Sequence, residues 1–129
     1  MSSPEAEIKK VFSPIGNQYL DSRDIVERLN YLENLPKEEV QEEEEYPDEY
    51  KELFDLREDI GKENFNFGIT FIEVDYWEEY AEELAYDVGY ADKNNTTFNW
   101  YIDWEKWAEA LSQDYSSVNL GSYEYYYQY

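Results

Sequence analysis

The clearest structural signal in this chain runs Asp75-Tyr76-Trp77-Glu78-Glu79-Tyr80-Ala81-Glu82-Glu83-Leu84-Ala85-Tyr86-Asp87. Apolar residues recur every three or four positions, which is the spacing of one face of an α-helix. That face consists of Trp77, Tyr80, Ala81, Leu84, Ala85 and Val88. The opposite face carries Asp75, Glu78, Glu79, Glu82 and Glu83. The pattern predicts a helix from about residue 75 to residue 88, which turns its aromatic side inward, displays carboxylates and ends at Gly89.

Three further helices are expected from the same kind of pattern, over residues 22–35, 48–59 and 103–114. Their inward residues are Ile25, Leu29 and Leu32, then Tyr50, Leu53 and Phe54, then Trp104, Trp107, Ala108 and Leu111. Asp21 or Ser22 can cap the first helix, because a short polar side chain accepts a hydrogen bond from a free backbone N–H there.

Strands are expected where β-branched and aromatic residues gather, at 67–72 and in a hairpin of 117–120 and 123–127 that turns at Gly121-Ser122. The predicted fold class is therefore α+β, a small single domain of about four helices with a short two- or three-stranded antiparallel sheet. Residues 1–20 form an N-terminal arm or edge segment, and residues 21–129 form the acidic domain.

Residues 37–47 form an acidic segment within that domain, with four consecutive Glu at 42–45. Like charges this close disfavour a compact state, which favours a solvated, mobile linker. The alternative is a segment that orders on contact with a basic partner, so that the acids of 38–49 extend a binding surface.

The chain has 32 acidic and 10 basic residues in 129, with a formal net charge of -22, no His and no Cys. The aromatic fraction of 19% is too high for simple disorder and can build a core in an acidic domain. Such a charge repels nucleic acid and anionic lipid surfaces and attracts basic proteins.

The missing His and Cys remove the usual acid–base group, the thiol nucleophile and the commonest metal ligands. No calcium-loop pattern and no phosphate-binding glycine loop is present. We therefore expect no enzyme, no cofactor and no metal site. A pair of catalytic carboxylates, as in glycosidases, is possible in any acidic chain, but no pattern in this sequence favours one. No signal peptide and no apolar run of about 20 residues is seen, so we expect a soluble cytoplasmic protein.

The acids of the second half are nearly uncompensated. Residues 73–114 contain 12 acids against two bases, Lys93 and Lys106. Helix positions three or four apart are about 5–6 Å from one another, and duplex DNA carries one charge per about 1.7 Å of axis. Rows of carboxylates on adjacent helices can therefore approach the charge density of phosphates. The predicted phosphate mimics are Asp75, Glu78, Glu79, Glu82, Glu83, Asp87, Asp103, Glu105, Glu109 and Asp114.

The C-terminal run of tyrosines, residues 123–129, is a second candidate for a binding surface. Strand alternation places Tyr123, Tyr125 and Tyr127 on one face and Tyr126 on the other, so core and exposed tyrosines share one strand. Exposed Tyr is common at interfaces, and this aromatic edge can contact a partner or a second copy of the chain, in a homodimer. The alternative is an aromatic-rich edge strand without a partner.

The C-terminal half resembles a known family. Tyr101-Ile102-Asp103-Trp104-Glu105-Lys106-Trp107-Ala108, followed by Leu111 and Asp114-Tyr115, is similar to the closing motif of ArdA-type antirestriction proteins. The acidic helix before that motif is also similar, and the resemblance covers about residues 69–127. Residues 20–29 instead resemble the opening of short phage proteins. The family consists of elongated acidic DNA mimics from phages and mobile elements that inhibit type I restriction–modification enzymes as dimers.

Charge pattern and resemblance together predict a phage or mobile-element inhibitor of a host defence system. It is expected to act in the host cytoplasm as a DNA mimic, in the basic groove of a restriction enzyme or CRISPR effector. It is expected to bind neither nucleic acid nor membrane directly. The alternative function is an acidic protein–protein adaptor or regulator that uses its aromatic edge without mimicry.

Overall fold

The structure is a computed structural model that describes residues 11–35 and 46–129. Its elements in chain order are β1 (Tyr19–Asp21), α1 (Ser22–Glu33), α3 (Tyr46–Ile60), α4 (Lys62–Phe67), β2 (Thr70–Glu73), the 3-10 helix η2 (Val74–Tyr76), α5 (Trp77–Asp87), α6 (Thr96–Asn99), α7 (Trp104–Ser112), β3 (Ser116–Leu120) and β4 (Tyr123–Tyr127). The described residues thus form six α-helices, four of them with seven residues or more, and one antiparallel sheet. The predicted α+β class is confirmed.

The sheet has four strands in the order β1-β2-β4-β3, one or two more than predicted. The hairpin of β3 and β4 turns at Gly121-Ser122, as the sequence predicted. Phe71 of β2 lies opposite Leu20 on one side and Tyr127 on the other. Because β4 pairs with both β2 and β3, the tyrosine run lies in an interior strand, and the prediction of an aromatic edge strand is wrong.

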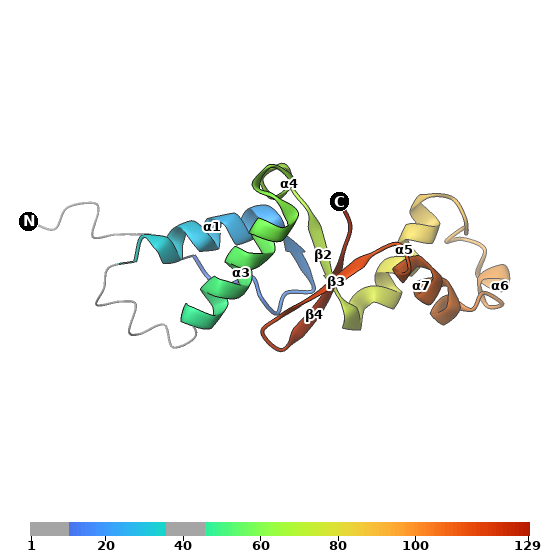
Figure 1. Cartoon of the computed structure of the whole chain (residues 1–129). Helices are drawn as coiled ribbons and strands as arrows, with labels where there is room; N and C mark the ends of the chain where they lie inside the picture. Colours follow the sequence, from blue (N-terminus) through green and yellow to red (C-terminus); the bar gives the residue numbers. More distant parts are fainter. Residues whose placement is uncertain (1–10, 36–45) are drawn as a thin grey trace, which may run out of the picture.

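Helices cover both faces of this sheet, which gives the molecule an elongated, three-part shape (Figure 1). On one face, α1, α3 and α4 enclose the larger core, which contains Ile25, Leu29, Leu53, Phe65 and, from the sheet, Leu20, Phe71, Leu120 and Tyr125. On the other face, α5 and α7 enclose a smaller core of Ile72, Trp77, Ala81 and Ala108, with Tyr126 packed against it. Consecutive tyrosines of β4 therefore pack into opposite cores.

Several predicted boundaries shift. The strand predicted at 67–72 begins at Thr70, because residues 62–67 form α4 instead. Gly61 and Gly68 bracket α4 at φ angles of 105° and 117°, a region that L-residues rarely adopt. A short helix that was not predicted, α6, lies between α5 and α7, and α7 ends before Asp114. Val88, expected on the inner face of α5, is exposed.

The segment before α1 is tied to the sheet and to α1. The Tyr125 hydroxyl accepts a hydrogen bond from Gly16 N (2.8 Å) and donates one to Asn17 O (2.9 Å). Arg28 Nη1 donates to Val11 O at 2.8 Å. Asp21 caps α1, as expected, by accepting from the backbone N of Arg23. Residues 36–45, which include most of the predicted acidic segment, lie outside the described residues.

An ion pair joins α1 to α3. Arg28 donates from Nε to Glu49 Oε2 (3.0 Å) and from Nη2 to Glu49 Oε1 (2.7 Å). The two side chains are only 5% and 7% exposed. Nearby, the Ser22 hydroxyl donates to Phe65 O and accepts from Ile69 N, both at 2.7 Å. These bonds fix the mutual positions of α1, α3, α4 and β2.

One buried carboxylate predicts a pH effect. Burial of Glu73 at the end of β2, reinforced by the charge and hydrogen bond of Asp75, raises the pKa of Glu73 above its ordinary value of 4.5. The folded state then binds this proton more tightly than the unfolded chain, so stability is lost as the pH rises through the folded-state pKa. Glu73→Gln is therefore expected to stabilise the fold near neutral pH, and the gain should vanish as the pH falls below 4.5. Urea unfolding of both proteins across this range measures the effect, and a gain independent of pH would contradict it.

Candidate basic-partner interface on α5 and α7

The two helices that display the predicted phosphate mimics are fastened to each other by two indoles. Trp77 Nε1 of α5 donates to Ala108 O of α7 at 2.7 Å, and Trp107 Nε1 of α7 donates to Ala81 O of α5 at 2.6 Å. Ala81 and Ala108 are both buried, and their small side chains allow the backbones to come this close. These two hydrogen bonds turn the apolar faces of α5 and α7 toward each other. The acidic faces of both helices are left on the outside.

On α5 the acids stand on the face away from this contact. Glu78, Glu79, Glu83 and Asp87 are exposed, whereas Glu82 is half-buried. The Oε1 atom of Glu82 accepts a hydrogen bond from the Tyr86 hydroxyl at 2.8 Å. Glu78 with Glu82, and Glu79 with Glu83, are four residues apart and form two rows along the helix. Asp75, in η2 just before α5, is also exposed.

On α7 the acids are fewer. Glu105 and Glu109 form one exposed row of the same spacing. Asp103 is the N-cap, and its Oδ1 accepts from Lys106 N at 3.1 Å. Asp114 is exposed but lies past the end of the helix, outside the predicted helical row.

Little cationic charge offsets these carboxylates. Within residues 11–35 and 46–129, the one ion pair made by any of the ten predicted phosphate mimics joins Glu83 Oε1 to Lys93 Nζ at 3.1 Å. Both side chains are more than half exposed, so this pair contributes little to stability. The exposed carboxylates of α5 and α7 therefore have almost no counter-charge among the described residues.

For Glu49, the predicted extension of this surface by the acids of 38–49 is wrong. Glu49, included among the acids of 38–49, does not face solvent, because it is buried against Arg28. Asp48 is exposed, but it lies on α3, across the sheet from α5. The acids of 36–45 lie outside the described residues.

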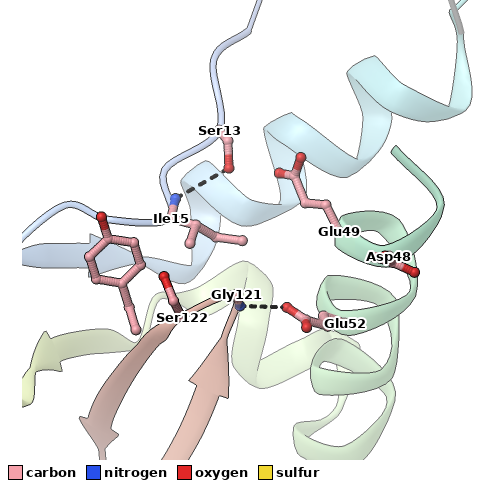
Figure 2. A pocket seen from close by; sticks show the side chains of 8 residues that line it. Ser13, Ile15, Asp48, Glu49, Glu52, Gly121 and Ser122 are labelled. Atoms are coloured by element: carbon pink, nitrogen blue, oxygen red, sulfur yellow. Dashed lines mark hydrogen bonds between the residues drawn. The ribbon is translucent and has the colours of Figure 1, made fainter. Parts of the chain in front are cut away.

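A second acidic surface surrounds a hollow of about 540 Å³ between α3, the segment before β1 and the β3–β4 turn (Figure 2). Its wall is formed by Ser13, Ile15, Asp48, Glu49, Glu52, Gly121, Ser122 and Tyr123. Glu52 Oε2 accepts from Gly121 N at 2.7 Å, and Glu49 is held by Arg28. Two of the three carboxylates, Glu49 and Glu52, are therefore bound within the fold, so we assign this hollow a structural role.

An exposed aromatic cluster was missed from the sequence. Tyr90, Phe98, Trp100 and Tyr101, which we call the aromatic tip, are exposed and belong to α6 or to the segments that flank it. Figure 1 shows α6 at the end of the molecule farthest from α1. The signal in the sequence is the run Phe98-Asn99-Trp100-Tyr101, which lies between the predicted helices of residues 75–88 and 103–114 and on the apolar face of neither.

No protein-family model, curated protein or solved structure matches this chain. The resemblance of residues 69–127 to ArdA-type proteins therefore stays a prediction. In the part of the chain that the structure describes, no helix combines the length and apolarity needed to cross a membrane. The same residues contain no cluster of three or more carboxylates arranged to hold a metal ion.

Proposed function

We propose that this protein is an inhibitor that acts as an acidic DNA mimic and occupies the basic DNA-binding groove of a host defence enzyme, such as a restriction enzyme or CRISPR effector. The observation that carries the proposal is the surface of α5 and α7, where exposed carboxylates stand in rows with a single lysine partner among the described residues. Rows of like charge destabilise a helix, by roughly 0.2–0.5 kcal/mol per pair, so their presence on a fixed scaffold favours a binding role.

Rigidity supports the same proposal. A decoy for DNA has to present its charges without a large ordering cost on binding. Here the exchanged indole bonds and the buried face of the sheet hold α5 and α7 in place before a partner arrives. The elongated outline also suits a long groove (Figure 1). One feature that favoured the adaptor alternative, an aromatic edge strand, is absent, because β4 is an interior strand.

The proposal predicts that duplex DNA and this protein exclude each other on a shared partner. The protein is immobilised, its partner is captured from host lysate and identified, and duplex DNA carrying the partner's binding site is added in increasing amounts. We expect the DNA to release the partner, and we expect its affinity for this protein to fall at least about tenfold between 50 and 200 mM salt. A partner that stays bound at saturating DNA, or whose affinity ignores salt, would rule out mimicry.

A further inference from the structure

In the described residues, exposed large apolar side chains are concentrated in one short stretch of the chain, which contains the aromatic tip. Ten large hydrophobic residues are exposed in the described part of the chain. Five of them fall between residues 88 and 101, namely Val88 and the four residues of the aromatic tip. Trp100 and Tyr101 are 85% and 81% exposed. Scattered exposed aromatics are ordinary, but their concentration in one short stretch favours an interaction site.

Residues of the tip line two hollows on the surface. One hollow, of about 360 Å³, is lined by Thr96, Thr97, Trp100 and Tyr101. The other, of about 630 Å³, includes Tyr90 and Phe98 together with the carboxylates Asp87 and Asp92. Aromatic rings and carboxylates thus share one end of the molecule, next to the last turn of α5.

The protein already holds one cation in such surroundings. Lys93 Nζ lies 5.6 Å from the centroid of the Tyr86 ring and 3.1 Å from Glu83 Oε1. Tyr86 in turn packs edge-on against Trp104, with ring centroids 5.6 Å apart. A ring face beside a carboxylate is the arrangement that binds a cation by charge and by its quadrupole together. Lys93 shows that this end of the fold provides it.

We propose that the aromatic tip binds an arginine-rich surface of the partner. This inference rests on the proposed function only for the partner's basic character. Arginine is selected over lysine because its planar, weakly hydrated guanidinium stacks on aromatic faces and also donates to carboxylates. The tip would thereby anchor one end of the decoy through contacts that salt screens less than a surface charge pair.

Charge decides against the other occupants of this surface. A second copy of the chain would bring a formal net charge of -22 against the same charge. Nucleic acid bases can stack on exposed rings, but their phosphates would meet the acids of α5. A basic surface is the one partner for which both the rings and the carboxylates are favourable.

The test uses two peptides of equal length and charge, one of arginine and one of lysine, titrated into the full-length protein. We expect the arginine peptide to bind about threefold or more tightly than the lysine peptide. The double variant Trp100→Ala/Tyr101→Ala keeps all charges and should lose that preference. Phe67→Ala, which removes another exposed aromatic on α4, is the matched control and should keep it.

Equal affinity for both peptides, or a preference that survives in the double variant, would overturn the inference. So would sedimentation showing that the wild-type protein forms a dimer that the double variant cannot form. The DNA competition experiment does not depend on this result. If DNA displaces the partner while arginine preference is absent, mimicry stands and the tip proposal fails; the reverse outcome removes mimicry alone.

Discussion

Replacing Arg28 by Met is expected to lower the free energy of unfolding by about 3 kcal/mol. The variant keeps an unbranched, apolar stem of similar length and removes the guanidinium that donates two hydrogen bonds to Glu49. The Glu49 carboxylate then remains in a site where it is 7% exposed, without the charge that offset its lost hydration. Urea unfolding at neutral pH, followed by circular dichroism, gives the difference in free energy.

The matched control lies on the same helix. Arg23 pairs with Asp21 at 2.7 Å, and its hydrogen bond holds the pKa of Asp21 below its ordinary value, but the Arg23 side chain is 64% exposed. Arg23→Met should therefore cost no more than about 1 kcal/mol. It also keeps the cap of α1, because that bond uses the backbone N of residue 23. If the two variants were equally stable, the buried pair would contribute no more than a surface pair.

The helices could be predicted well from the sequence because their signal is local. Ile25, Leu29 and Leu32 recur at helical spacing, and all three are buried as expected. The hairpin was also within reach, since Gly121 adopts a φ of 63°, which favours glycine at a tight turn. Spacing and turn chemistry are properties of neighbouring residues, so a single sequence contains them.

What the sequence could not provide was the pairing of distant segments. β1 is three residues long and becomes a strand only because it pairs with β2, some fifty residues later. The interior place of β4 likewise depends on β2. With α helices on both sides of this sheet, Tyr125 and Tyr126 pack into different cores. Strand alternation predicted their opposite directions but not that both faces would be covered.

The candidate site was predictable in part for the same reason. The rows on α5 follow from helical spacing, and Glu78, Glu79 and Glu83 are exposed as expected. The fate of Glu49 depended on a contact with Arg28 from another helix, which no spacing rule describes. The aromatic tip could not be predicted, because an aromatic residue is assigned to the core by default unless its three-dimensional surroundings are known.

Neutralising the rows on α5 is expected to have the largest effect on binding. The quadruple variant Glu78→Gln/Glu79→Gln/Glu82→Gln/Glu83→Gln removes four charges and keeps side chains of the same size. If these carboxylates substitute for phosphates, affinity for the captured partner should fall by about a hundredfold or more at low salt, since the loss of one charge contact is worth roughly 1 kcal/mol or more. The dependence of log affinity on log salt should also become shallower, by up to about 1 for each carboxylate that meets a basic residue.

The chain offers a control with the same net charge. Glu27, Asp55, Glu58 and Asp59 are exposed on α1 and α3, across the sheet from α5. Their neutralisation to Gln or Asn also removes four charges, so it measures how much affinity comes from the total charge alone. Mimicry requires the α5 variant to lose far more affinity for the partner than this control. The reason is that the basic residues of a groove interact mainly with the charges closest to them. Equal losses would mean that the partner responds to net charge, and α5 would then have no special part in binding. In the α5 variant, relief of the repulsion within each row is opposed by loss of the Glu83–Lys93 pair and of the favourable first-turn charges of Glu78 and Glu79. We therefore expect a stability close to that of the parent, and urea unfolding of both proteins checks that a weaker complex is not caused by unfolding.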